Sequence, residues 1–402
     1  MAIRALGGIA VSKLFATFMG TSGITLLSHF QNLMALFTQL PIESVNRSLM
    51  KFWSDPKLED RAKLKLFHTG FWVVNLLVLL SFLVVYFNQD YFLRRLVASY
   101  SVGQFMAIFV PGILMMLFTG LLNSIILAKR FVKGFAFVSV SGTILLVICV
   151  FLAVYYGNMD QALLSIVVGY GLMIISALIF AYRSGILKTL SLGGPHKDSL
   201  KKISSFILMA IGAIVVGKLL DFFVRDYIIE HYGADRTGLW QGVVKMSNNF
   251  LMVFSGTVGV IYYPKMASLI HDHKALRSYT LKIMGFVTFV TLICLGIYYF
   301  NRDFILTLFF SSGFERASYL VRHQAVGDFF AILSYLLAYL LSARVKTAQY
   351  IGAQLVSAAI YLGVISLLLD THNLEALAIA YKWRFIGFFA ILVIFNRRLL
   401  FK

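Results

Sequence analysis

The feature that most constrains this fold is a succession of apolar segments, each long enough to cross a lipid bilayer as a helix. A helix needs about 20 apolar residues to span the hydrocarbon core, and hydropathy indicates about twelve such segments. Of the 402 residues, 60% are hydrophobic and only 13% are charged, which excludes a water-soluble globular domain of this size. We therefore predict an all-α polytopic membrane protein. The expected spans are 3–19, 22–46, 66–88, 102–127, 132–156, 160–182, 203–225, 238–263, 279–300, 318–343, 347–369 and 374–396.

The connections between these segments alternate in charge. The formal net charge is +19, but the basic residues separate apolar segments and form no polar domain, which argues against a nucleic-acid partner. Most Lys and Arg residues lie in the connections after every second span and at the C-terminus. By the positive-inside rule, both termini are expected in the cytoplasm. The opposite connections hold only Arg94, Arg95, Arg225, Arg236, Arg302 and Arg316.

Cysteine content and connection length argue against redox, metal and enzymatic chemistry. Cys149 and Cys294 each lie inside an apolar run, and no CxxC motif or His/Cys cluster occurs. We therefore predict no disulfide framework, no metal site and no cofactor. No connection is long enough for an extramembrane catalytic domain, so we do not expect an enzyme.

The chain divides into two halves that resemble each other. The connection after the sixth span contains a Gly-Gly-Pro sequence and is predicted to be a cytoplasmic linker, 184–202, between an N-terminal lobe, 1–183, and a C-terminal lobe, 203–402. "GTSGITLLSHFQNLM" follows the first span and "DRTGLWQGVVKMSNNFLM" follows the seventh. In both, a hydroxyl-Gly-aliphatic turn is expected before a helix that carries amides. Such a duplication is the usual plan of a transporter.

Several spans contain basic residues, which are costly in a bilayer and mark functional sites. Lys13, Lys218, Lys245 and Lys382 are each expected roughly 10 Å below the periplasmic boundary, at 1.5 Å per residue. In span eight, Lys245 shares one helical stripe with Gln241 and with Asn248 or Asn249. Comparable stripes occur in three other spans. Their members are Ser28, Asn32, Gln39 and Glu43 in span two, Lys218, Asp221 and Arg225 in span seven, and Gln324, Asp328, Tyr335, Tyr339 and Ser342 in span ten.

A structural role is an alternative for most of these side chains. Lys218 with Asp221 forms either an internal ion pair or part of a substrate site. Arg225 and Arg322 are shallow enough to reach the interface, and Lys13 could also be an interfacial anchor. His29, at the depth of the lysines, is either a packing residue or a ligand.

Two further positions are constrained by helical geometry. Lys382 and Arg384 lie about 200° apart around one helix, so both cannot face one cavity. Lys245 has no acidic residue three or four positions away and is the strongest functional candidate.

The sign of these buried charges indicates the class of ligand. The basic groups outnumber the three acids Glu43, Asp221 and Asp328, so the interior is expected to attract an anion and repel a cationic drug. Phosphate, pyrophosphate or an acidic sugar fits such a cavity. The three carboxylates are the candidates for coupling to an ion gradient, because a buried carboxylate can titrate.

The blocks "GTSGITLLSHFQNLM", "SSFILMAI", "GLWQGVVKMSNNFL", "YYPKMASL" and "HQAVGDFF" resemble those of Wzx-type flippases of O-antigen and enterobacterial common antigen units. These flippases are part of the multidrug/oligosaccharidyl-lipid/polysaccharide exporter (MOP) superfamily. The resemblance implies a V-shaped, MATE-like fold of twelve helices in two six-helix lobes, in the bacterial inner membrane. It implies translocation of an undecaprenyl-pyrophosphate-linked oligosaccharide to the periplasmic leaflet by alternating access.

The resemblance also implies partners, and the sequence differs from the usual pattern of the family at two points. Lipid-linked oligosaccharide, membrane lipids and the polysaccharide polymerase machinery are the expected partners of what we expect to be a monomer. The first span begins later than is usual for the family, and it lacks the acid that drug antiporters of the superfamily carry there. The headgroup is expected to meet Lys245, Asn248, Asn249, Lys218, Lys382, Lys13, Asn32, His29 and Arg322.

Three other functions compete with this interpretation. A drug or cation antiporter of the same fold is disfavoured by the sign of the cavity. A membrane polymerase or ligase acting on the same lipid carrier is expected to have a large periplasmic loop, which this sequence lacks. A flippase for the peptidoglycan precursor is not distinguished, because that headgroup is also anionic.

Overall fold

The chain folds into helices because a backbone inside lipid can satisfy its N–H and C=O groups only within itself. The computed structural model describes residues 2–53, 58–87, 89, 99–191, 193–201, 203–204, 220–269, 272–344 and 346–401. Within these ranges the secondary structure is helical and no strand is present. Lys218 and the side chain of Glu43, two predicted site residues, lie outside the described residues.

The described helices group into two compact units. The first unit comprises Met1–Thr25 and Tyr227–Lys402, and the second comprises Leu26–Asp226. Two long helices, α1 (Ala2–Trp53) and α9 (Leu220–Ser268), contribute residues to both units. The division into lobes on either side of the 184–202 linker stays a prediction.

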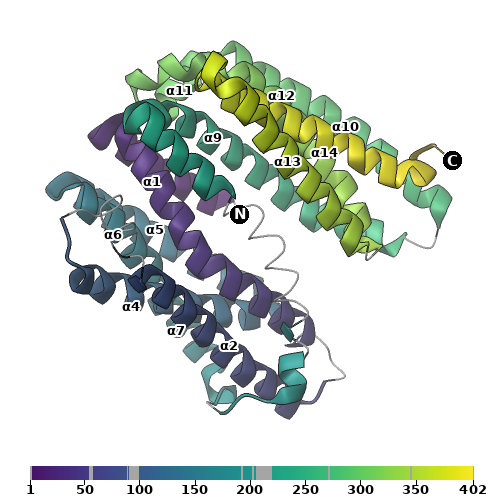
Figure 1. The fold of residues 1–402 in the computed structure, drawn as a ribbon. Coiled ribbons are helices and arrows are strands. Elements are labelled where there is room, and N and C mark those ends of the chain that lie inside the picture. The colour runs from purple at the N-terminus through teal and green to yellow at the C-terminus, as the bar shows by residue number, and fades with distance from the viewer. Residues whose placement is uncertain are drawn as a thin grey trace. The chain divides into compact units, whose positions relative to one another are not determined.

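The second unit is a bundle in which α4, α5, α6 and α7 pack against one another (Figure 1). The N-termini of α4 and α6 are closed by capping boxes, from Ser101 to Gln104 and from Asn158 to Gln161, which satisfy main-chain N–H groups at the helix ends. The helices of this unit are α2 (Asp60–Phe87), α4 (Val102–Ala128), α5 (Val132–Tyr156), α6 (Met159–Gly171), α7 (Met173–Arg183) and the 3₁₀ turn η1 (Leu187–Thr189).

The first unit is organised around α12, which packs against α10 and α14, while α13 packs against α14 (Figure 1). In the most apolar segment of each span, 72% of the residues are buried for α12 but only 22% for α10. Polar groups on α12 are therefore inside the protein and shielded from lipid. The remaining helices are α10 (His273–Phe300), α11 (Arg302–Phe309), η3 (Ser312–Ala317), α12 (Ser318–Ala343), α13 (Thr347–His372) and α14 (Glu375–Phe401).

The predicted all-α polytopic fold is confirmed. Within the described ranges, nine helices are long and apolar enough to cross a membrane. The single candidate Ala5–Ala35 overlaps both the expected first span and the expected second span, because α1 runs through both. Sequence reasoning treated the segment before span ten as a connection, whereas it contains the short helix α11.

The two expected turns are breaks inside long helices, and their predicted positions are wrong. Ser22–Ile24 and Thr237–Leu239 are helical, and the backbone breaks at Gly20 and Gly233, with φ of 68° and 76°. These angles lie in the left-handed region that glycine adopts without a steric penalty. Side chains from α1 bind groups at the second break: Thr21 Oγ1 donates to Asp235 Oδ1 at 2.9 Å, and Thr25 Oγ1 donates to the Ala234 carbonyl at 2.6 Å.

The glycine of the second repeat serves packing instead of a turn. A Cβ atom at Gly238 would lie 2.0 Å from the main-chain oxygen of Thr21, so the missing side chain lets α9 approach α1. This close contact lies wholly within the first unit.

Replacing Gly238 tests that contact. We expect Gly238→Ala to destabilise the protein by about 1–3 kcal/mol, because a methyl group there must displace main chain. Gly285→Ala in α10 is the matched control, since a Cβ there meets nothing within 4 Å. Thermal unfolding in detergent measures both, and equal melting temperatures for the two variants would contradict the proposed packing role.

Candidate functional site

A buried carboxylate joins three helices of the first unit. Asp328 of α12 is only 1% exposed. Its Oδ1 atom accepts hydrogen bonds from the Ser247 hydroxyl of α9 and from the Tyr381 hydroxyl of α14, the latter at 2.8 Å. Gln324, one turn earlier on α12, donates from Nε2 to Ser247 Oγ at 3.0 Å. We call these four residues the Asp328 cluster.

The local sequence brings the cluster together in two ways. Gln324 and Asp328 are four residues apart and therefore share one face of α12. A Cβ at Gly327 would lie 2.3 Å from the Tyr381 ring and 3.3 Å from Lys382 Cα, so glycine allows α14 to approach α12 closely. The close approach brings the Tyr381 hydroxyl within reach of the carboxylate.

The second carboxylate oxygen of Asp328, Oδ2, is the atom of the cluster that can bind a proton or a cation. Both donors reach Oδ1, and in the described part of the chain Oδ2 has no hydrogen-bond partner. A buried carboxylate without a cationic partner is costly when charged, so it favours taking up a proton or a cation. Among the described residues, no group of three or more His, Cys, Asp or Glu side chains could hold a metal ion.

The predicted stripe of span eight lies on a different face of the same helix. Ser247 faces α12 and α14, and Lys245, two residues earlier, is rotated by about 200° from it and points away from them. Lys245 is half-buried and Asn248 is exposed. Asn249 lies near α1, with its Oδ1 atom 3.9 Å from the position a Cβ of Gly8 would take. Helix α9 thus carries one polar face inside the unit and a second, basic face beside α1.

The structure separates the two basic residues of span twelve. Lys382 Nζ lies 3.5 Å from His323 Nδ1 of α12, and His323 Nε2 lies 3.2 Å from Glu375 Oε1. The Arg384 guanidinium lies over the ring of Tyr361 in α13, 5.3 Å from its centroid. Lys382 thus contacts α12 and Arg384 contacts α13, and that the two cannot share one cavity stays a prediction.

Lys13 binds the end of a short helix. Its Nζ donates to the carbonyls of Thr307 and Leu308, at 3.2 and 2.9 Å, in the last turn of α11. These carbonyls have no partner within their own helix, and a cation is favourable at the negative end of the helix dipole. Arg322 is exposed on α12, which agrees with an interfacial side chain.

The second unit buries a further set of predicted residues. Arg225 is only 9% exposed and donates from Nη1 to the Ser28 carbonyl at 2.6 Å. The interpretation of Arg225 as an interfacial anchor is therefore wrong, because its guanidinium bonds a main-chain group inside the unit. His29 is buried with its ring stacked on Phe222 at 4.7 Å, as expected for a packing residue, and Asn32 is also buried.

Sequence reasoning missed some partners and left others undecided. Asp221 is half-buried, and its predicted pairing with Lys218 involves a residue outside the described ranges. Ser247, Tyr381 and His323 were not singled out from the sequence, because an uncharged side chain costs much less free energy inside a membrane span than a charged one. Their positions, one or two residues from a basic residue that the sequence analysis named, were the available signal.

Substitution of Asp328 tests the cluster as a structural unit. Asp328→Asn keeps an oxygen that accepts from Ser247 and Tyr381, whereas Asp328→Ala leaves both hydroxyls buried without an acceptor. We expect the Ala variant to lose about 1–3 kcal/mol of stability and the Asn variant to lose less. Melting temperatures in detergent measure the difference, and an Ala variant as stable as the Asn variant would contradict the role of these hydrogen bonds.

Comparison with known proteins agrees with this fold. No family model matches the chain. The chain is 23% identical over 397 residues to a Lipid III flippase of Escherichia coli (strain K12), and the match covers 96% of this chain and 92% of that protein. A Lipid III flippase of Shigella flexneri matches to the same extent. Both relatives are transporters by name, which agrees with the predicted transport role and not with an enzyme.

Solved structures with the same fold include two kinds of transporter. An inward-facing multidrug resistance MATE family transporter of the MOP superfamily has a TM-score of 0.76 at 12% identity, covering 99% of this chain and 94% of that one. The Lipid II flippase MurJ, in an inward closed conformation, has a TM-score of 0.70 at 15% identity, covering 98% and 85%. The chain thus has the fold of the MATE and MurJ transporters, and its predicted resemblance to lipid-linked oligosaccharide flippases is confirmed by sequence similarity along nearly its whole length.

Proposed function

We propose that this protein moves an undecaprenyl-pyrophosphate-linked oligosaccharide from the cytoplasmic to the periplasmic leaflet by alternating access. The observation that carries the proposal is the sequence match to a Lipid III flippase, which has 23% identity and covers 96% of this chain. The fold alone does not decide the substrate, because drug transporters and a lipid flippase share it. The sequence match and the predicted excess of basic groups both favour an anionic lipid over a cationic drug.

The headgroup contacts are proposed to centre on the basic face of α9. The Lys245 amine suits a pyrophosphate, and the amides of Asn248 and Asn249 suit sugar hydroxyls. This face points away from α12 and α14, so these three side chains are not used by the Asp328 cluster. Lys382 is proposed as a secondary contact beside His323. Lys13, Lys218, Arg322, Asn32 and His29 are retained as weaker candidates.

Coupling to an ion gradient is proposed at Asp328, ahead of Asp221 and Glu43. Its buried carboxylate accepts hydrogen bonds from hydroxyls of two neighbouring helices at Oδ1. Its other oxygen, Oδ2, has no hydrogen-bond partner among the described residues. Gain of a proton or a small cation would change the bond to Ser247, and Ser247 lies on the same helix as Lys245. A shift of α9 would therefore move Ser247 and Lys245 together, and this movement would link ion binding to headgroup binding.

The cellular setting follows from the same proposal. The protein is a multi-pass membrane protein, and we propose the bacterial inner membrane with both termini in the cytoplasm. A monomer that hands its product to the polymerase machinery is the simplest assembly consistent with this role.

Complementation tests the transport function and the Lys245 site. In a strain that lacks its own flippase, we expect the wild-type chain to restore surface polysaccharide and Lys245→Ala to fail at normal expression. Lys129→Ala, in the connection between α4 and α5, is the control and should rescue fully. Full rescue by Lys245→Ala at limiting expression would refute the site. If lipid-linked oligosaccharide does not accumulate without the protein, the flippase function is refuted.

A flipping assay in proteoliposomes tests the coupling role of Asp328. We expect an imposed pH or sodium gradient to accelerate flipping by the wild type and to have no effect on Asp328→Asn, because the amide cannot titrate. Asp221→Asn is the comparison and should keep the stimulation. Equal stimulation of Asp328→Asn and the wild type would show that this carboxylate does not carry the ion.

A further inference from the structure

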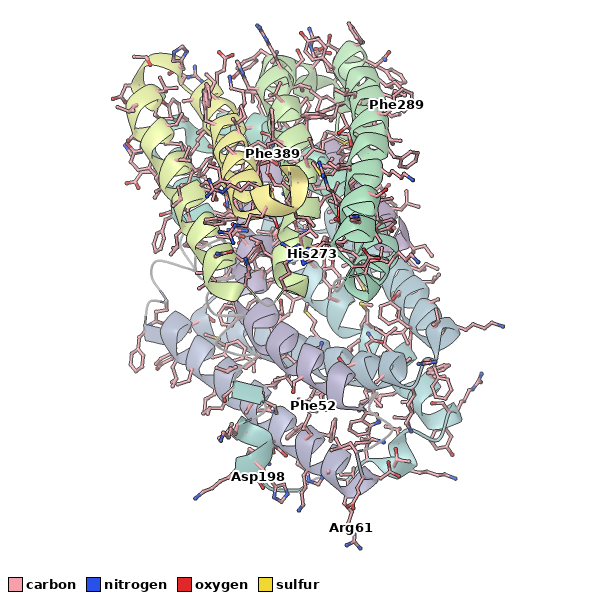
Figure 2. All side chains as sticks on the ribbon, turned by 90° about the vertical axis from the view of Figure 1, so that its right-hand side faces the viewer. Phe52, Arg61, Asp198, His273, Phe289 and Phe389 are labelled. Carbon is pink, nitrogen blue, oxygen red and sulfur yellow. The ribbon has the colours of Figure 1, made fainter. Side chains whose placement is uncertain are left out.

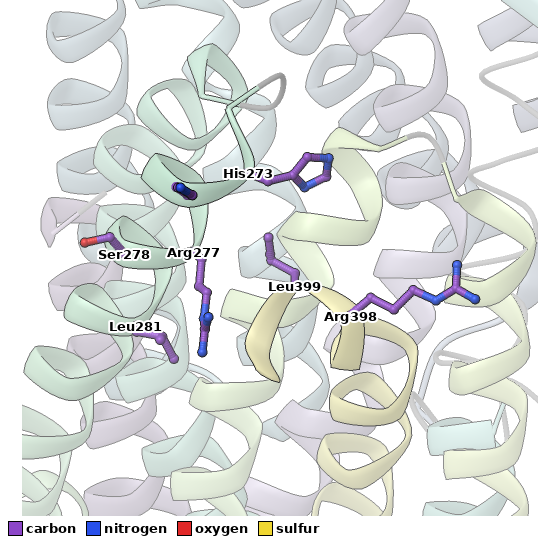
Figure 3. Close-up of a pocket in the computed structure, with 7 residues that line it drawn as sticks. His273, Arg277, Ser278, Leu281, Arg398 and Leu399 are labelled. Atoms are coloured by element: carbon purple, nitrogen blue, oxygen red, sulfur yellow. The ribbon is translucent and has the colours of Figure 1, made fainter. Parts of the chain in front are cut away.

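A basic cavity lies in the first unit, between the N-terminal end of α10 and the C-terminal end of α14 (Figure 3). Its volume is about 600 Å³, within the usual range for a ligand site. Its lining includes His273, Lys274 and Arg277 from α10, and Arg398 with Leu399 from α14.

Among the described residues, no acid in the lining neutralises the positive charge of this cavity. Its described lining residues include no Asp or Glu. Asp272, the acid next to the cavity in sequence, accepts a hydrogen bond from the Ala275 N–H at 2.9 Å and so caps α10. In the described part of the chain, Lys274, Arg277 and Arg398 form no ion pair. Because Asp272 is used at the N-terminus of α10, the basic side chains of the cavity lining favour an anion from outside the protein.

The cavity opens onto an apolar stripe. Leu281 lines the cavity and is itself exposed. Beyond it, large apolar side chains remain exposed along one side of α10, and Phe289 is 65% exposed and points outward from the helix (Figure 2). From Leu281 to Ile297 the stripe covers about 24 Å at 1.5 Å per residue, which is most of the roughly 30 Å thickness of the hydrocarbon core. The stripe is completed by Phe286, Leu292 and Ile293.

This cavity is distinct from the proposed transport site. Arg398 follows Tyr381 and Lys382 on the same helix by about four and a half turns, or roughly 24 Å. It therefore lies at the opposite end of α14 from the Asp328 cluster.

We propose that the cavity binds the headgroup of an anionic glycerophospholipid, with its phosphate between Arg277 and Arg398 and one acyl chain along the exposed side of α10. A basic pocket between membrane helices is the usual form of an anionic-lipid site. The cavity lies at the ends of two membrane-spanning helices, beside side chains that face lipid, and this position favours a lipid headgroup over a soluble anion. The bound lipid would connect α10 to α14, and α14 also carries Tyr381 of the Asp328 cluster. The proposal goes beyond the transport function and does not depend on it.

Lipid titration of the full-length protein tests this site. Native mass spectrometry in detergent would compare phosphatidylglycerol with phosphatidylcholine of the same acyl chains. We expect Arg277→Gln/Arg398→Gln to weaken phosphatidylglycerol binding by about tenfold or more, since each basic residue contributes about fivefold. Lys282→Gln/Arg397→Gln is the matched control, because it removes the same charge from the same two helices outside the cavity lining. The control should change binding by less than about twofold.

Several results would overturn the proposal. Equal weakening by both double variants would show a diffuse surface effect, and equal binding of phosphatidylcholine would show that charge is not recognised. Displacement by millimolar inorganic phosphate would identify a soluble-anion site. Binding of a polyprenyl pyrophosphate but not of phosphatidylglycerol would identify a substrate-loading site. Melting temperatures without added lipid separate a binding defect from misfolding, and we expect them to be unchanged. If the double variant unfolds, the single variants Arg277→Gln and Arg398→Gln repeat the test.

Discussion

The absence of water in the bilayer core is the constraint on which the rest of this structure depends. It forces the backbone into helices, and it makes a polar side chain inside a span costly unless the protein supplies a partner. The Asp328 cluster shows the result: one carboxylate on the most buried of the candidate spans in its unit is bonded by hydroxyls from α9 and α14. The same rule explains why Lys13 bonds the end of α11 and Arg225 bonds a main-chain carbonyl.

In the proposed transport mechanism, helix α9 combines two roles because its two polar faces lie about 200° apart. Ser247 contacts Asp328 inside the first unit, while Lys245 and Asn249 lie on the side away from α12 and α14. A group that can titrate and a group that can bind an anion therefore act on one rigid element. This arrangement allows coupling without a chain of intermediate residues, since both groups bias the position of the same helix.

The charges of this chain serve three physical purposes that composition does not separate. Some neutralise internal groups, as Lys13 does at the carbonyls of α11. Others, such as Lys245, lie on a face without a role in the internal cluster. A third set, around Arg277 and Arg398, lines a cavity at the helix ends beside an apolar stripe. Because all three sets are basic, a net charge of +19 indicates an anionic environment but not which anion meets which group.

The order of apolar segments by itself determined the helical fold, the approximate span limits and the presence of costly charges inside spans. Helical spacing also determined that Lys382 and Arg384 point in different directions, because angle along one helix is a local property. Only the tertiary structure decided which neighbour each face meets: Tyr381 beside Asp328, Arg225 against Ser28, and Arg398 in the lining of the same cavity as Arg277. These contacts join residues far apart in sequence, and periodicity carries no information on how separate helices pack.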